Sequence, residues 1–183
     1  MKKHLLAMSL LAAVAVPASA EGVYIFGDVG QSKLSIEDDG WDVSKTDTAF
    51  SFGVGYALNS TFALEVAYRD FGKVTLFQDQ YEKDRLDSSA LQVSVLAKFP
   101  VSDAIDIYGR AGVARLTYDW KYQDFEYPEY NDIDSESKSR AFFGIGASYA
   151  LNDNISLRAE YNRYAKWDEA TASALTIGAV YSF

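Results

Sequence analysis

Apolar and polar residues alternate one by one along eight segments of the chain, which is the period of a β-strand whose two faces differ. In each segment, bulky apolar and aromatic side chains occupy one face, and small or polar side chains occupy the other. No helical segment remains to cover such a sheet. The predicted strands are Val23 to Ser32, Thr46 to Leu58, Phe62 to Arg69, Ser88 to Phe99, Ile105 to Tyr118, Arg140 to Leu151, Ile155 to Asn162 and Ser173 to Phe183.

A sheet with one bulky apolar face and no covering layer closes on itself, because its first and last strands otherwise have unpaired edges. We therefore predict an all-β fold, an eight-stranded antiparallel up-and-down transmembrane β-barrel with its bulky face toward lipid. The alternative is a soluble periplasmic barrel that encloses an apolar ligand. Charged residues that share their face with many Gly, Ala and Ser residues favour the transmembrane barrel, since its interior is crowded.

Charged residues lie on the small-residue face of the predicted strands, and we expect none on the bulky face. A register slip of one residue would carry them into hydrocarbon, at about 2–4 kcal/mol for each Arg or Lys near the midplane. Four alternating glycines predict lumen space for long charged side chains: Gly53, Gly55, Gly144 and Gly146. The inner charges are Asp28, Glu65, Arg69, Lys98, Asp106, Arg110, Arg158 and Glu160.

The connections alternate between short and long, as in outer-membrane barrels, whose short turns are periplasmic and whose long loops are extracellular. The long connections, 34–45, 72–87, 119–138 and 165–172, hold 17 acidic and 7 basic residues, a net of -10. We interpret them as a solubilising rim, with divalent-cation bridging to lipopolysaccharide as the alternative. Aromatic residues predict two girdles, Tyr56, Phe62, Phe99, Tyr149, Tyr181 and Phe183 at the short-turn end and Tyr68, Tyr118, Trp120, Tyr161 and Trp167 at the other.

The first twenty residues have the features of a secretory signal peptide: Lys2 and Lys3, an apolar run, and small residues that end at Ala20. We expect residues 1–20 to be removed and residues 21–183 to form one domain, exported through the periplasm to the bacterial outer membrane. Cleavage changes the formal charge from -9 to -11, since 15 basic residues then face 26 acidic ones. So acidic a chain suggests no nucleic-acid partner.

Catalytic and metal-binding residue types are scarce after the signal peptide. The sequence has no cysteine, and its one histidine, His4, lies within the signal peptide. This removes the usual general base and the usual metal ligands. Glu65 near Arg69 or Arg158 fits a neutralised structural pair better than a carboxylate site. We expect no enzyme activity, no cofactor and no metal site.

Four short runs resemble the N-terminal transmembrane barrel of the outer membrane protein A family: Ala63 to Tyr68, Leu96 to Lys98, Asp106 to Arg110 and Arg158 to Tyr161. The resemblance implies that Glu65 pairs with Arg158 and exchanges toward Lys98. Ser148 departs from it, because the family has a second lumen acid there, so an opened state would leave Arg158 without that partner. The family's periplasmic peptidoglycan-binding domain has no counterpart in this sequence.

We therefore expect a small integral outer-membrane barrel with a structural or surface role and a mostly plugged lumen that conducts ions narrowly at most. The expected partners are outer-membrane lipid, lipopolysaccharide and the barrel-assembly machinery, and the expected state is a monomer. The lumen ion-pair network, a candidate gate, comprises Glu65, Arg69, Lys98, Arg110, Arg158 and Glu160. The candidate C-terminal assembly signal comprises Ile177, Tyr181 and Phe183.

The alternative function is that of a surface adhesin acting through its acidic, aromatic extracellular loops. Aromatic residues exposed among acids are typical of a contact surface. The other interpretation is an extended ribbon whose rings pack on each other or on lipid headgroups. The candidate surface for a ligand comprises Trp120, Tyr122, Phe125, Tyr127 and Tyr130.

Overall fold

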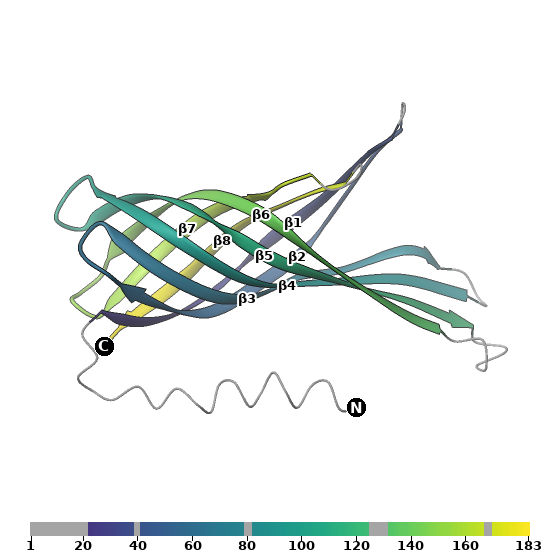
Figure 1. The fold of residues 1–183 in the computed structure, drawn as a ribbon, viewed down its shortest axis with the longest axis horizontal. Helices are drawn as coiled ribbons and strands as arrows, with labels where there is room; N and C mark the ends of the chain where they lie inside the picture. Colours follow the sequence, from purple (N-terminus) through teal and green to yellow (C-terminus); the bar gives the residue numbers. More distant parts are fainter. Residues whose placement is uncertain (1–21, 39–40, 79–81, 125–131, 167–169) are drawn as a thin grey trace.

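The computed structural model describes residues 22–38, 41–78, 82–124, 132–166 and 170–183, which form eight antiparallel strands. Each strand pairs with its neighbours in the sequence and β1 pairs with β8, so the sheet is a closed barrel and the predicted fold class is confirmed (Figure 1). No helix in these ranges is long and apolar enough to cross a membrane. The strands are β1 (Val23–Asp38), β2 (Trp41–Ala57), β3 (Phe62–Gln78), β4 (Glu82–Pro100), β5 (Ile105–Asp124), β6 (Asp132–Ala150), β7 (Ile155–Tyr164) and β8 (Ala170–Ser182).

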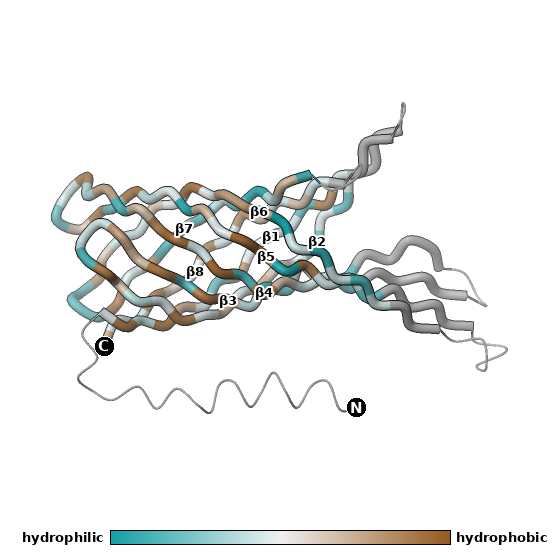
Figure 2. Tube along the Cα trace, viewed as in Figure 1, coloured by the Kyte–Doolittle hydropathy of each residue, from teal (hydrophilic) through white to brown (hydrophobic). Residues whose placement is uncertain are grey.

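The two faces of the barrel differ as the alternation predicts. Hydrophobic and hydrophilic positions follow one another along each strand (Figure 2). On the outer face Val93 and Ile177 are 54% and 65% exposed, whereas Glu65 and Arg158 in the lumen are 1% and 5% exposed. Bulky side chains outside and charges inside are the reverse of a soluble protein, and they suit a surface that lies in lipid.

The short turns are fixed by polar side chains that accept hydrogen bonds from the backbone. Asn59 Oδ1 accepts from the N–H groups of Thr61 and Phe62 at 2.9 and 2.8 Å. Asn152 Oδ1 does the same for Asn154 and Ile155, at 3.0 and 2.8 Å. Because each turn sets the register of its hairpin, these bonds also decide which residues face the lumen.

Beyond the barrel the strands are longer than the sequence predicts, and most of the predicted long loops are strand. β2–β3 pairing ends at Phe50 and Asp70, and β6–β7 pairing ends at Phe142 and Tyr164. The sheet therefore divides into two arms, one from β1, β2 and β8 and the other from β3 to β6, which diverge in Figure 1. The predicted ends were wrong because a strand beyond the closed barrel no longer lies between lipid and a crowded lumen, so its sequence needs no apolar alternation.

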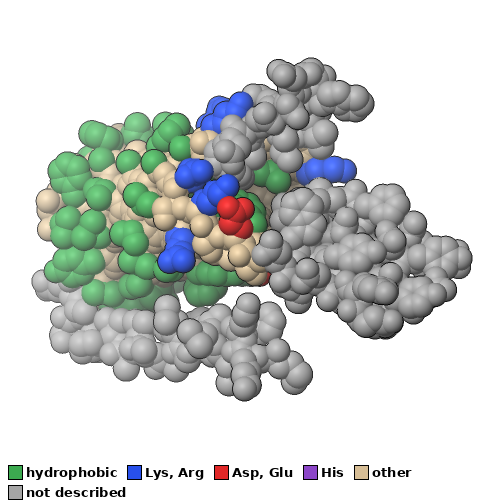
Figure 3. All heavy atoms as spheres, turned by 45° about the vertical axis from the view of Figure 1, so that its right-hand side comes forward, with side chains coloured by type: hydrophobic (Ala, Val, Ile, Leu, Met, Phe, Trp, Pro, Cys, Tyr) green, Lys and Arg blue, Asp and Glu red, His purple; other side chains and the backbone are tan. Residues whose placement is uncertain are grey.

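Two predictions about the outer face are wrong. Arg115 lies on it, exposed, within the predicted fifth strand, and Figure 3 shows Lys and Arg side chains where the hydrophobic surface gives way to the arms. Tyr118 does not join an outer girdle, because it packs on the inner side against the buried cluster around Phe71 and Phe142. The side chain of Trp120 and all of Trp167 lie outside the described part of the chain. The aromatic residues at the short-turn end are exposed, as Phe99 at 55% illustrates.

Candidate lumen site

Three arginines and three carboxylates occupy the middle of the lumen and form one network. Each of the six residues is at most 6% exposed. Equal numbers of the two charges make the network neutral, which burial in a narrow interior requires. Its members are Asp28 from β1, Glu65 and Arg69 from β3, Arg110 from β5, and Arg158 and Glu160 from β7.

Arg158 is bonded on several sides. Its Nε and Nη2 donate to Asp28 Oδ1 and Oδ2, both at 2.6 Å, and its Nη1 donates to Glu65 Oε1 at 3.0 Å. Its guanidinium carbon lies 3.9 Å from the centroid of the Phe26 ring. Ser51 Oγ donates to Asp28 Oδ2 at 2.8 Å. The bidentate pair fixes both the position and the plane of the guanidinium.

The remaining bonds close the network into a ring. Arg110 contacts Glu65 and donates through Nη1 to Glu160 Oε1 at 2.7 Å. Arg69 Nη2 donates to Glu160 Oε1 at 3.2 Å and to Ser51 Oγ at 3.4 Å. Because Ser51 also bonds the β1 carboxylate, acids and bases alternate around a closed circuit. Removing any one charge would therefore leave at least one buried neighbour short of a partner.

Inner-face glycines let side chains from strands two apart meet. Arg158 and Asp28 each lie opposite Gly178 of β8, which separates β7 from β1. A Cβ at Gly178 would meet the Asp28 carboxylate. The same arrangement joins two tyrosine hydroxyls to the network, Tyr24 to Glu65 across Gly55 at 3.0 Å and Tyr108 to Glu160 across Gly146 at 3.1 Å.

The prediction that four glycines make room for long charged side chains is therefore wrong. The period of two identifies the glycines as inner, but the space they leave is taken by rings and by an amide. A Cβ would meet Phe26 at Gly53, Tyr24 at Gly55, Asn162 at Gly144 and Tyr108 at Gly146.

An apolar layer lies above the network toward the arms. Tyr164 is its centre, with the Phe71 and Phe142 rings at centroid distances of 5.1 and 5.3 Å. The tyrosine hydroxyl accepts a hydrogen bond from Gln92 Nε2 at 2.5 Å. Leu116 completes the layer, and these apolar side chains are 1–6% exposed. Below the network, Tyr24, Phe26, Leu96 and Tyr108 belong to a second buried cluster.

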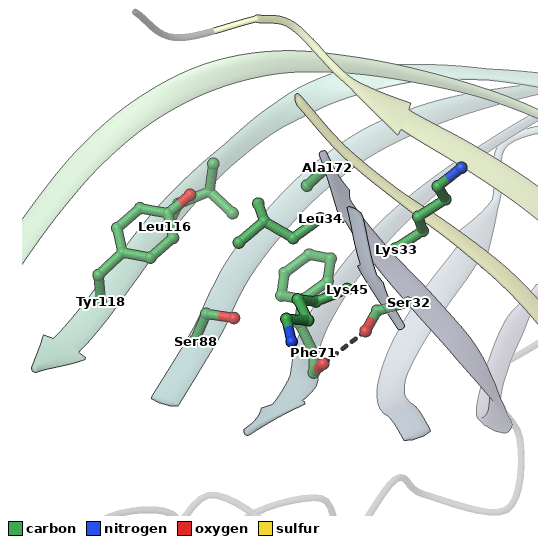
Figure 4. A pocket seen from close by; sticks show the side chains of 9 residues that line it. All are labelled: Ser32, Lys33, Leu34, Lys45, Phe71, Ser88, Leu116, Tyr118 and Ala172. Atoms are coloured by element: carbon green, nitrogen blue, oxygen red, sulfur yellow. Dashed lines mark hydrogen bonds between the residues drawn. The ribbon is translucent and has the colours of Figure 1, made fainter. Parts of the chain in front are cut away.

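Small cavities lie at both ends of the lumen. At the arm end a cavity of about 20 Å³ lies beside Leu34, Phe71 and Leu116 (Figure 4). Lys33 and Lys45 also line this cavity. That volume admits about one water molecule. At the short-turn end a cavity of about 80 Å³ is polar, and Lys98 and Asp106 line it.

Five of the six residues predicted for the ion-pair network lie together, and Lys98 lies apart from them. Its Nζ is 5.4 Å from the centroid of the Tyr24 ring, and no ion pair joins it to a carboxylate of the described residues. Asp28 was missed as a member, although its inner position was predicted. Ser148 faces Arg158 across the β6–β7 pair, and Asp28 supplies the second carboxylate that this position lacks.

The other predicted sites lie outside the lumen. Trp120 and Tyr122 belong to β5, but their side chains, like all of Phe125, Tyr127 and Tyr130, fall outside the described residues, as does the predicted signal peptide. At the C-terminal end Ile177, Tyr181 and Phe183 are 65%, 44% and 43% exposed on the outer face. In the ranges the structure describes, no group of three His, Cys, Asp or Glu side chains could hold a metal ion.

Comparison with known proteins gives a family and several relatives. Residues 4–183 match the family model described as outer membrane protein beta-barrel domain. Outer membrane protein P5 of Haemophilus influenzae is 31% identical over 124 residues, 61% of this chain and 33% of P5, so the match spans about a third of that relative's length. An uncharacterized protein of Haemophilus influenzae is 29% identical over 168 residues, covering 89% of this chain and 90% of that protein.

Solved structures resemble the barrel at low sequence identity, which shows the fold alone. Neisserial surface protein A gives a TM-score of 0.66 at 18% identity, covering 89% of this chain and 98% of that one. The attachment invasion locus protein of Yersinia pestis, solved with the heparin analogue sucrose octasulfate, gives 0.63 at 16% identity, covering 89% of this chain and 99% of that one.

Proposed function

The chain belongs to the outer membrane protein beta-barrel domain family, and from this premise we propose a closed barrel with a structural or surface role. It is an integral protein of the bacterial outer membrane. Its relatives are outer membrane proteins. The proposal adds that the lumen is mostly plugged and conducts ions narrowly at most.

The filling of the lumen carries this proposal. An ion that crosses the barrel meets two barriers in series, the neutral ring and the apolar layer around Tyr164. The ring holds buried charges in direct contact, and the layer offers no hydration. The small cavities at the two ends support a discontinuous water path, as expected for eight strands. Bulk solute passage is therefore not part of the proposed role.

Planar-bilayer recordings test the narrow ion path, which by resemblance runs past Glu65, Arg158 and Lys98. We expect the single-channel conductance of Glu65→Ala and Arg158→Ala barrels to differ from that of the unchanged barrel, because each change breaks the ring. Arg163→Ala, on the outer face of β7, is the matched control and should leave the conductance as it was. Unchanged conductance in both ring variants would contradict the ion path and leave a closed barrel.

Two features of the outer face support the proposed envelope partners. Arg115 and Arg163 are exposed near the arms, where they can meet the phosphates of lipopolysaccharide. Tyr181 and Phe183 turn outward at the end of the chain, with ring centroids 5.1 Å apart, and together with Ile177 they suit a signal that assembly machinery reads. Within one membrane, we propose a monomer.

A second function, adhesion, is favoured by the two arms, in which the strands continue beyond the closed barrel (Figure 1). Trp120 and Tyr122 occupy β5 in the larger arm. Deleting residues 124–136 tests this function, and we expect attachment of cells to host or abiotic surfaces to fall. Undiminished attachment would contradict adhesion through these loops.

A further inference from the structure

The outer edge of β6 has no neighbouring strand beyond the barrel. Within the described residues, β7 pairs with β6 only from Phe142 to Ala150, whereas β6 begins at Asp132. β5 covers the opposite edge throughout this extension. In Figure 1 β6 forms the margin of the larger arm. Such an edge is a template for another strand.

The backbone pattern identifies the groups that open onto this edge. Ala141 accepts a hydrogen bond from Ala165 N at 2.9 Å, so its carbonyl points toward β7. The N–H and C=O groups of every second residue in a strand point the same way. Ser135, Ser137 and Ser139 therefore present their backbone groups to the free edge.

Side-chain bonds hold this segment in the sheet. The hydroxyls of Ser137 and Thr117 lie 3.1 Å apart, and Ser135 Oγ donates to Asp119. Both partners belong to β5, so the serine hydroxyls turn back into the arm. Arg140 Nη1 donates to the Ser139 carbonyl at 3.0 Å, and a pairing strand would replace this bond.

The charges of this segment are complementary to those of a second, antiparallel copy of the segment. From Asp134 to Arg140 serines alternate with two acids and then two bases. Glu136 and Lys138 share one face, with Oε1 and Nζ 3.2 Å apart, and their side chains are 67% and 33% exposed. In an antiparallel pair of two such strands about Ser137, Glu136 lies opposite Lys138 and Asp134 lies opposite Arg140, on both sides of the twofold axis.

The backbone and the charges select the same register. With the axis at Ser137, the serines form the hydrogen-bonded pairs. The charged residues form the non-hydrogen-bonded pairs, where opposing side chains are closest. An axis at Lys138 would place two lysines opposite each other, and an axis at Glu136 would place two glutamates opposite each other. Both like-charge pairs are unfavourable.

We propose that the β6 edges of two copies of this protein pair antiparallel about Ser137. In one membrane every β6 runs from the outside toward its barrel, so antiparallel edges belong to copies on two cells that face each other. Many copies per cell would add avidity. The inference rests on the proposed adhesion function and names its partner, a second copy of this chain, while the proposed monomer within one membrane is unaffected.

Clumping of two differently fluorescent cell populations tests the pairing, in a host that lacks long surface polysaccharide. We expect the unchanged protein to clump cells and both Glu136→Lys and Lys138→Glu to abolish clumping, because each opposes like charges. A mixture of the two variants should clump as two-coloured aggregates, since positions 136 and 138 are both basic in one variant and face two acidic positions in the other. The barrel of each variant is checked by gel mobility of unheated against heated protein.

A double variant makes the test independent of folding. Glu136→Lys with Lys138→Glu in one chain restores opposite charges with its own copies but not with the unchanged protein, so the two populations should clump in separate, single-coloured aggregates. Lys45→Glu on the other arm is the control and should clump normally. The pairing is wrong if the unchanged protein does not clump cells, or if the single variants fail to clump together while folded at the surface. Attachment of folded Glu136→Lys cells to host or abiotic surfaces tests the broader adhesion function separately, because this variant keeps residues 124–136 and loses only the pairing.

Discussion

Replacing Arg158 by alanine should lower the free energy of unfolding by about 3–5 kcal/mol, the cost of removing one partner from a buried ionic pair. Arg158 makes two hydrogen bonds to Asp28 and one to Glu65, and these carboxylates are 6% and 1% exposed. Without the guanidinium, both carboxylates lose this cationic partner, and water in its place would carry no compensating charge. Urea titration of the folded barrel in lipid, followed by tryptophan fluorescence and gel mobility, measures the loss.

Arg163→Ala, measured in lipid without lipopolysaccharide, is the matched control, because Arg163 lies on the same strand but is exposed on the outer face. Surface substitutions of this kind change stability by about 0.5 kcal/mol or less. Changing Arg158 and Asp28 together to leucine should recover part of the loss, since an apolar pair leaves fewer buried charges. An Arg158→Ala barrel as stable as the Arg163→Ala barrel would contradict a closed ring of buried ion pairs.

The sequence predicted which face each barrel residue occupies, because lipid outside and a crowded lumen inside enforce the period of two. Glu65, Arg110 and Arg158 were therefore placed correctly in the lumen. The strand ends were not predictable in this way. From Asp132 to Lys138 β6 extends beyond the closed barrel, where serines and charges need no apolar alternation, so this segment was predicted as part of a loop.

The period of two shows which face a residue occupies but not its position along the barrel axis. The predicted set of partners of Arg158 was therefore incomplete. Asp28 and Arg158 lie 130 positions apart in the chain and meet only because β1 and β8 close the barrel. Gly178 between them permits the contact. Lys98 is on the predicted face but too near the short-turn end to join an ion pair of the described network. The register between β1 and β8, where the barrel closes, is therefore the missing information.

Replacing Gly146 by valine should destabilise the barrel by about 1–3 kcal/mol through overpacking. A further loss of about 1.5–3 kcal/mol follows if Tyr108 can no longer donate to the Glu160 carboxylate. A Cβ at Gly146 would meet the end of the Tyr108 ring, which is 3% exposed and would have to shift away from Glu160. Gly109→Val is the matched control, because nothing lies within 4 Å of a Cβ at that outward position.

Neither glycine has a positive φ among the described residues, so backbone strain is the same for both substitutions and only the available space differs. We expect the Gly109→Val barrel to match the unchanged protein in urea titration, and the Gly146→Val barrel to unfold at clearly lower urea. Gly146→Val combined with Tyr108→Leu should regain the packing part of the loss but not the hydrogen bond. The proposed role of Gly146 requires that Tyr108 can reach Glu160 only across a residue without a side chain. Equal stability of the two valine variants would contradict this role.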